Sequence, residues 1–396
     1  MSTHLQRRGF LRVLGAGSLA PMVPLAPLSL SGCGAAMPPD AIEAWRGPDA
    51  ELAAQADPRL WILSHAILAP HSHNLQSWIA DLGTPNQITL YCDLNRLLPQ
   101  TDPLSRQIMM SHGTFLELLD LAARERGLRA DIALFPQGAF GPTTLDNRAV
   151  AQVRLTPDPT VTKDPLFAQI LDRHTNRSAY DITRAIPLAA WQAMQAAAGP
   201  SIRVGHAGLE QGAALQQHRR IALDAWRVEL TVPRTIMESF KLLRVGASEI
   251  AAHRDGLSMT SPMIVALDRL GLFDRSRAPA PDDYATTSQV KEFDAKLAST
   301  PGFAWMITAD NTRATQINAG RAYARLQLAA TAHGLGMQPL SQALQEYAEQ
   351  QQPYAAIHAL VGATEPGATV QMWARVGYAP AAEPAPRRRL RDFVRA

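Results

Sequence analysis

The chain has 396 residues, 46% hydrophobic and 18% charged, which is the composition of a globular protein. Lys and Arg number 38 against 35 Asp and Glu, but three arginines precede Cys33 in a segment without acids, so the balance downstream is 35 minus 35, or zero. This neutral balance argues against nucleic acid or an anionic surface as the main partner.

Residues 1–33 have the pattern of an export signal. Arg7 and Arg8 form a twin arginine followed by Phe10 and Leu11, and the weakly apolar run after them ends on Leu-Ser-Gly-Cys. That quartet resembles a lipobox, which predicts lipidation of Cys33. Prolines interrupt a run already near the minimum length for spanning, so the pattern favours a periplasmic protein anchored to a membrane surface by lipid over a transmembrane helix.

The segment that follows is Pro-rich, and we expect residues 34–57 to form a tether. Cys92 is then the one remaining thiol, so no intrachain disulfide is expected, and it should pack as a small hydrophobe. The stretch 379–386 is also Pro-rich and predicts a tail that crosses the surface.

The stretch APHSHNLQSW, residues 69–78, first suggests half of a metal site. His71 and His73 are one residue apart, and on a strand both imidazoles would point to the same side. No carboxylate or Cys lies at ligand spacing nearby, so no metal is predicted.

An internal repeat comes next. HGTFLELLDLAARERGL at His112 aligns with AGRAYARLQLAATAHGL at Ala319, with Gly113 on Gly320 and a constant offset of 207 residues. Two unrelated Leu/Ala helices with Gly stops are the alternative. Strands are predicted at 89–94, 130–135, 151–155, 303–308 and 369–378, and further helices at 187–198, 208–230 and 288–298. This is an α+β pattern given twice, with a helical insertion in the second copy.

A basic element, RHTNR, spans residues 173–177. At a helix N-terminus Arg173 and Arg177 would project to one side and bind a phosphate, with Thr175 donating its hydroxyl. A solvated basic surface with Thr175 as an N-cap is the alternative. Two further segments of interest are HGLGMQPLSQ, residues 333–342, and PRRRLRDF, residues 386–393.

In this order the loop, the basic element and the C-terminal arginines resemble those of the nitroreductase superfamily of flavin enzymes, and more closely its Acg-like branch. The resemblance implies an α+β nitroreductase-like fold that binds FMN between two subunit-like halves fused into one chain, expected at 58–165 and 166–396, with a helical insertion at about 205–299. It also implies one FMN and a monomeric pseudo-dimer. The second half has Pro200 and Ser201 where its own flavin loop should be, without the Asn, Gln or Trp that should follow.

The resemblance assigns cofactor contacts to four segments. They are Pro70, His71, Ser72, Asn74 and Gln76 of the loop, Arg173, Thr175 and Arg177 of the basic element, Met337, Gln338, Pro339 and Leu340 of a turn whose backbone would face the flavin edge, and Arg387, Arg388 and Arg389. Superfamily loops usually have Ser where His71 stands and Pro where Ser77 stands.

The expected function is an exported FMN-dependent oxidoreductase that passes two electrons to a nitroaromatic, a quinone or a similar small acceptor. Nicotinamide donors are cytoplasmic, so a periplasmic enzyme needs another reductant, either a membrane quinol or a partner protein. The alternative is a protein that stores FMN without turnover, beneath a lid formed by the insertion.

Overall fold

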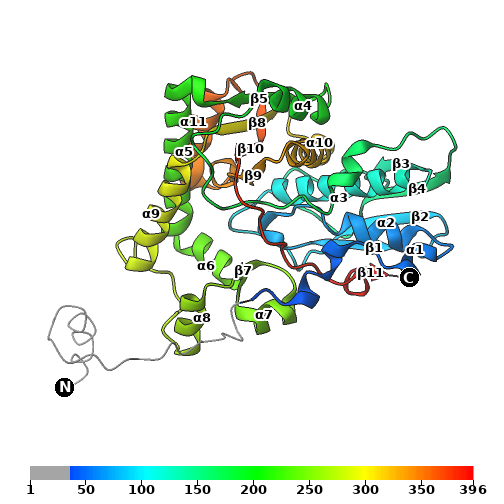
Figure 1. Cartoon of the computed structure of the whole chain (residues 1–396), viewed down its shortest axis with the longest axis horizontal. Coiled ribbons are helices and arrows are strands. Elements are labelled where there is room, and N and C mark those ends of the chain that lie inside the picture. The colour runs from blue at the N-terminus through cyan, green and yellow to red at the C-terminus, as the bar shows by residue number, and fades with distance from the viewer. Residues whose placement is uncertain (1–35, 396) are drawn as a thin grey trace. The chain divides into compact units, whose positions relative to one another are not determined.

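Two mainly antiparallel sheets and a pair of long helices organise the chain (Figure 1). The computed structural model describes residues 36–395, so the predicted signal and Cys33 lie outside the described residues. The fold is α+β, as predicted. No helix between residues 36 and 395 has both the length and the apolar character needed to cross a membrane.

The first sheet has the order β11-β1-β2-β4-β3. Its strands are β1 (Trp78–Asp81), β2 (Gln87–Cys92), β3 (Leu128–Leu134), β4 (Ala149–Pro157) and β11 (Val394–Arg395). Helices α2 (Arg59–Ala66) and α3 (Arg106–Glu125) pack in the same hydrophobic core. Cys92 is buried, as expected of a small hydrophobe.

The second sheet repeats this arrangement. Its strands are β5 (Arg203–Ala207), β8 (Gly302–Thr308), β9 (Gly336–Pro339) and β10 (Thr369–Gly377), in the order β5-β8-β10-β9. Helices α4 (Leu188–Ala198) and α10 (Arg313–Ala332) contribute to a core on this sheet. Apart from β11, which adds a fifth strand beside β1, both sheets have their strands, counted along the chain, in the order first, second, fourth, third. The predicted strands at 89–94, 130–135, 151–155, 303–308 and 369–378 all lie in these sheets, with small differences at their ends.

The repeat helices α3 and α10 have the same length, 20 residues, and the same 207-residue offset at both ends. They pack on each other through their glycines, because a Cβ on Gly113 would collide with the carbonyl of Ile317, and a Cβ on Gly320 with the carbonyl of Met110. Met110 and Ile317 are themselves 207 residues apart. The two helices therefore contact each other through equivalent positions.

The first residues of the two long helices, Arg106 and Arg313, also make equivalent contacts. Arg106 donates to the carbonyls of Leu344 (2.7 Å) and Gln371 (2.9 Å), in the second sheet's half of the chain. Arg313 donates to the carbonyls of Leu104 (2.8 Å) and Gly141 (3.0 Å), in the first sheet's half. Each buried guanidinium thus satisfies backbone acceptors of the opposite half.

In the segment predicted as a helical insertion, at about 205–299, the structure differs from the prediction in two respects. Residues 205–207 belong to β5, which pairs with β8, and the block after them contains a two-stranded parallel sheet, β6 (Leu243–Val245) with β7 (Leu257–Met259). Its helices are α5 (Gly212–Thr231), α6 (Pro233–Lys241), α7 (Gly246–His253), α8 (Pro262–Arg269) and α9 (Tyr284–Ala298). Residues of α5 and α9 share a third core with β8, β10 and α11 (Gln351–Leu360). The hydrophobic strands β8 and β10 are accordingly almost wholly buried.

The predicted tether is wrong for residues 36–57. This segment contains the short helices η2 (Pro39–Ala41), η3 (Glu43–Arg46) and α1 (Ala50–Ala54), and Trp45 packs in the first core. The predicted surface tail is only partly correct, because the chain near its end is bonded to this segment: Arg387 donates its backbone N–H to the carbonyl of Ala41 (2.9 Å). The Pro-rich composition predicted a tether because it gives no indication that Trp45 is buried in the core.

The predicted helix start at RHTNR is also wrong. Thr175 forms a parallel bridge with Met337, and Asn176 donates its N–H to the Met337 carbonyl (3.0 Å), so the segment lies extended along the edge of β9. The next helix, α4, begins only at Leu188. Likewise, residues 336–339 of the turn expected within 333–342 form strand β9. Backbone pairing with β10 and with residues 175–176 outweighs the local signals of Gly336 and Pro339.

Candidate functional site

The loop after α2 has an unusual backbone. Its central turn is η4 (Ser72–Asn74), and His73, Asn74 and Gln76 have φ angles of +49°, +52° and +53°. Non-glycine residues rarely adopt this left-handed conformation, which costs about 1 kcal/mol or more each unless the surroundings enforce it. Three in one short loop indicate a functional site. They also rule out the strand on which both histidines would point to one side.

Helix α3 holds the loop in place through hydrogen bonds of its polar side chains. Thr114 Oγ1 donates to the Pro70 carbonyl (2.7 Å), Ser72 N–H to Ser111 Oγ (3.1 Å), and Ser72 Oγ to Gln107 Oε1 (3.2 Å). Gln107 Nε2 is buried without a partner among residues 36–395. These helix residues were not predicted as part of the site, although three polar residues spaced by three and four on an apolar helix were the available signal.

His71 connects two parts of the loop through hydrogen bonds of its side chain. Its Nδ1 donates to the Ser72 carbonyl (2.8 Å), and its Nε2 lies 2.7 Å from Ser77 Oγ and accepts the Ser77 N–H at 3.1 Å. Burial lowers the pKa of His71 well below its usual value, so the ring is neutral. His71 and Ser77 are the two departures from the superfamily loop pattern, and they bond to each other. The histidine therefore holds Ser72 and Ser77 of the loop together.

His73 points to a different partner. Its Nε2 lies 3.4 Å from Ser239 Oγ at the end of α6. Burial and, next, the charge of Arg177 lower its pKa to about 4. The two imidazoles therefore have separate partners within residues 36–395. Among the described residues no cluster of three or more His, Cys, Asp or Glu is arranged to hold a metal ion.

The loop, the basic element and the C-terminal segment converge at Asn74 and the Leu68 carbonyl. Arg387 donates to Asn74 Oδ1 (2.7 Å), and Asn74 Nδ2 donates to the Pro386 carbonyl (3.1 Å). Arg173 and Arg387 both donate to the Leu68 carbonyl, at 2.6 Å and 3.2 Å. The sequence therefore identified three distant segments that meet in space.

We call Arg173, Arg177, Arg375 and Arg387 the arginine cluster. The charge of Arg173 acts on Arg387 and that of Arg177 on Arg375, and Tyr323 lies close to both Arg173 and Arg177. No carboxylate within residues 36–395 forms an ion pair with any of the four. Arg173 is 1% exposed and Arg387 4% exposed. Burial lowers the pKa of Arg173 to about 10, and burial together with the charge of Arg173 lowers that of Arg387 well below its usual value. Buried unpaired cations are costly, so this cluster is arranged for a bound anion.

Free donors in the cluster fit a phosphate group. Arg173 Nε, Arg387 Nε, Arg375 Nη1 and the Tyr323 hydroxyl are buried without partners in the described part of the chain. Arg177 is exposed as a residue, but burial of its guanidinium group lowers the pKa of that group, and its side chain makes no hydrogen bond or ion pair with residues 36–395. Guanidinium groups bind phosphate oxygens through paired N–H donors, so the residues present fit the FMN phosphate. Tyr323, on α10, was missed because its apolar neighbours suggested a core residue.

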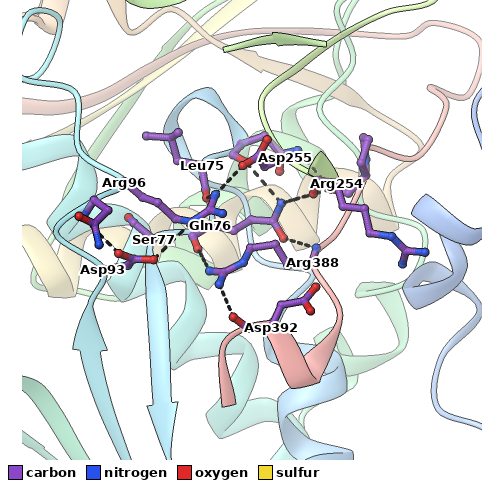
Figure 2. A network of polar contacts seen from close by, with 12 residues as sticks. Leu75, Gln76, Ser77, Asp93, Arg96, Arg254, Asp255, Arg388 and Asp392 are labelled. Atoms are coloured by element: carbon purple, nitrogen blue, oxygen red, sulfur yellow. Dashed lines mark hydrogen bonds and ion pairs between the residues drawn. The ribbon is translucent and has the colours of Figure 1, made fainter. Parts of the chain in front are cut away.

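Gln76 and Arg388 differ from their predicted role as cofactor contacts (Figure 2). Gln76 is fully buried, its Nε2 donates to the Arg254 carbonyl (2.9 Å), and its Oε1 accepts the Arg388 N–H (2.8 Å). The Arg388 guanidinium donates to the carbonyls of Gln76 and Asp392. Arg389 lies 3.8 Å from Asp40, away from the cluster. Of the three C-terminal arginines, only Arg387 joins the arginine cluster.

The remaining predicted contacts lie on β9 and beside it. Leu340 donates its N–H to the Trp373 carbonyl (2.7 Å), the Met337 carbonyl is taken by Asn176, and Gln338 Oε1 accepts from Arg375 (2.6 Å). A Cβ on Gly336 would press on the side chain of Asn176. Gln338 therefore orients a cluster arginine, whereas Met337, Pro339 and Leu340 connect β9 to its neighbours. Thr175 contacts Met337 through a backbone bridge.

Residues 239–256, which we call the clamp, close over the loop. Gly256 donates its N–H to the Asn74 carbonyl (3.2 Å), and Asp255 pairs with Arg96 (2.5 Å) and Arg244 (2.8 Å). Arg254 pairs with Asp40 and Glu43 of the N-terminal segment. Figure 2 shows Gln76 between Arg254 and Arg388 at the centre of this network. These pairs could not be predicted from the sequence, because their members are separated by more than 150 residues, except Arg244 with Asp255.

Comparison with known proteins gives a match to one family model. Residues 210–378 match the model of the nitroreductase family. The matched range includes β9, while the loop, RHTNR and the C-terminal arginines lie outside it.

A curated relative is an uncharacterized protein of Mycobacterium tuberculosis, 30% identical over 127 residues, which are 30% of this chain. The match spans about a third of that relative's length (36%). Similar solved structures include an FMN-dependent nitroreductase of Mycobacterium smegmatis in complex with NADPH (17% identity, 57% of this chain and 94% of that one, TM-score 0.35). A putative nitroreductase of Desulfovibrio desulfuricans in complex with FMN is 12% identical, over 58% and 95% of the two chains, with TM-score 0.32.

Proposed function

We propose that this chain is an FMN-dependent oxidoreductase of the nitroreductase type that passes two electrons from a donor to a nitroaromatic, a quinone or a similar acceptor. The observation that carries the proposal is the arginine cluster. It gathers four guanidinium groups beside a strained loop, without a single paired carboxylate among the described residues. A phosphate monoester is the anion that such a set of donors fits best.

Each part of the site has a role in this proposal. Arg173 and Arg387 bind the phosphate from the buried side, and Arg177 completes the charge from the exposed side. Asn74 holds Arg387, while the α3 residues Gln107, Ser111 and Thr114 hold the loop in its strained form. FMN, when bound, supplies two-electron chemistry at its ring, and the protein supplies orientation and exclusion of water.

We further propose that the chain is an intrachain pseudo-dimer of two subunit-like halves. The shared strand order, the 207-residue offset of α3 and α10, and the equivalent contacts of Gly113 and Gly320 support this. Strand β11, from the end of the chain, pairs with β1 of the first half. The loop between α4 and β5 has only four residues, 199–202, against eleven between α2 and β1, which supports a single composite site.

The cellular setting is also a proposal, supported by the sequence of residues 1–33. The twin arginine and the lipobox favour export of a folded, cofactor-loaded protein and attachment to a membrane through Cys33. In that compartment the reductant would be a membrane quinol or a partner protein.

Storage of FMN without turnover is the second candidate function, and the clamp favours it. Bonds from Gly256 to Asn74, from Gln76 to Arg254 and between His73 and Ser239 hold residues 239–256 over the loop. A clamp that stays closed would keep an acceptor away from the ring.

Cofactor content tests the shared part of both functions. Purified protein should be yellow and release one FMN per chain on denaturation. Arg177→Ala should lose most of this FMN, and Asn74→Ala a smaller share, because the arginine change leaves phosphate charge uncompensated. Full FMN content in Arg177→Ala would mean that the phosphate binds elsewhere.

Turnover separates the two functions. The flavoprotein is reduced with dithionite and mixed with a nitroaromatic or a quinone. Rapid reoxidation supports the oxidoreductase, and a flavin that no acceptor reoxidises supports storage. If the clamp is the cause of slow reoxidation, Asp255→Ala should accelerate it.

A further inference from the structure

We propose that Trp45 is a positioning residue for the phosphate site, and that the N-terminal arm that carries it, residues 39–46, closes on the protein when FMN binds. The inference rests on the proposed function and extends it to a segment that lies more than a hundred residues from RHTNR in the chain.

Trp45 lies against two buried arginines of the cluster, Arg173 and Arg387. Its ring centroid is 4.8 Å from the guanidinium carbon of Arg387 and 5.5 Å from that of Arg173, and 4.3 Å from the ring centroid of His174. The indole is 8% exposed. An aromatic face attracts cations through its quadrupole, so one ring contributes to holding both guanidiniums where no carboxylate does.

The arm is bonded to the chain on both sides of Arg387. Trp45 Nε1 donates to the Ala385 carbonyl (2.8 Å), and the Ala41 carbonyl accepts the Arg387 N–H (2.9 Å). Asp40 and Glu43 pair with Arg254 of the clamp. The position of the arm and the position of the Arg387 side chain are therefore linked by direct bonds.

Charge explains why the cofactor would close the arm. In the absence of an anion, the charges of Arg173 and Arg387 repel each other, which disfavours the packed arrangement around the indole. A bound phosphate removes this repulsion and favours the closed arm. By thermodynamic linkage the closed arm raises phosphate affinity by the same factor. The arm follows the predicted signal segment in the chain. A closed arm would therefore distinguish protein that has bound FMN from protein that has not.

Binding of FMN and of riboflavin, which lacks the phosphate, tests the role of Trp45. We expect Trp45→Leu to weaken FMN binding roughly tenfold to thirtyfold, as expected for one or two partly desolvated cation–π contacts, with riboflavin affinity within about twofold of wild type. Trp45→Phe, which keeps an aromatic face, should recover most of the ratio of FMN to riboflavin affinity. If Trp45→Leu does not fold, Trp45→Met provides the same comparison.

Trp61 is a matched control. It is 9% exposed and has Arg126 over its ring at 5.1 Å, but it contacts no residue of the cluster. Trp61→Leu should leave the affinity ratio unchanged. An equal fall of the ratio in Trp61→Leu would reduce Trp45 to a general packing residue and overturn the proposal.

Limited proteolysis of the full chain tests the closing of the arm. Trypsin should cleave after Arg46 more slowly when FMN is bound, riboflavin should not protect, and Trp45→Leu should abolish the protection. A wild-type affinity ratio in Trp45→Leu, or cleavage that FMN leaves unchanged, would overturn the inference while leaving the FMN site intact. A wild-type protein that binds FMN no more tightly than riboflavin would instead overturn the phosphate site itself.

Discussion

The clamp and the arginine cluster contain the same kind of side chain in opposite electrostatic states. In the clamp, Asp255 lies between Arg96 and Arg244, and Arg254 has Asp40 and Glu43. In the cluster, Arg173 and Arg387 are as buried as Arg254 but have only carbonyl and amide oxygens as hydrogen-bond partners. A paired guanidinium connects segments of the fold, whereas an unpaired one remains available for an anion.

From this comparison we expect substitutions in the clamp to lower mainly the stability of the fold, and substitutions in the cluster to lower mainly the affinity for FMN. Removing one member of a buried ion pair leaves an uncompensated charge and destabilises the fold. Removing an unpaired buried cation takes away a repulsion along with its hydrogen bonds, so stability without ligand changes less than affinity does. The predictions below are ordered from the largest expected effect to the smallest.

Asp255→Ala should be the most destabilising of these changes. Two guanidiniums lose their shared carboxylate, so we expect the free energy of unfolding to fall by about 3 kcal/mol. Urea denaturation of protein with and without FMN measures it. The ratio of FMN to riboflavin affinity should stay near wild type, and a large fall in that ratio would break the division between clamp and cluster.

Arg387→Met should show the opposite result. The substitution removes a charge-assisted contact to phosphate, so FMN affinity should fall about a hundredfold, equivalent to about 2.7 kcal/mol, with little change in riboflavin affinity. Isothermal titration gives both constants. Arg388→Met, next in the chain but bonded to Gln76 and Asp392, is the control and should lower stability more than the affinity ratio.

Inorganic phosphate alone should stabilise the wild-type protein without flavin. With a Kd of about 1 mM, 10 mM phosphate would add about 1.4 kcal/mol to the free energy of unfolding. Thermal melts at constant ionic strength, with chloride as the control anion, measure the shift. Arg387→Met should lose the phosphate effect and Asp255→Ala should keep it. A shift of equal size in both variants would argue against a specific anion site.

The smallest effect concerns pH. Burial lowers the pKa of His73 and of His174 to about 4, with neighbouring arginines as a further cause for each. Because these values lie below the ordinary 6.5, the folded state loses stability as pH falls from 6.5 towards 4, by on the order of 1–2 kcal/mol for both groups after solvent screening. His174→Phe should flatten part of this loss in denaturant titrations at several pH values. A variant with the same pH profile as wild type would contradict the assignment.

Much of the fold could be predicted because its signals are local. The 207-residue repeat, the Leu/Ala helices and the β-branched and aromatic strands report burial along one stretch of chain, and the structure has α3, α10, β8 and β10 there. Trp45 was missed because one aromatic residue in a Pro-rich stretch has no periodicity. RHTNR was misjudged because its conformation is determined by pairing with β9.

The sequence by itself determined the elements and the three segments that meet at the site, since helix and strand formation and the motif residues are local properties. Only the tertiary structure decided which arginines are paired and which are free, because the partner of a charge is chosen by packing of distant segments. It removed Gln76 and Arg388 from the site, joined His71 to Ser77, and brought Trp45 against Arg173 and Arg387. The physical reason is that an ion pair or a cation–π contact acts over a few ångströms, whatever the separation in the chain.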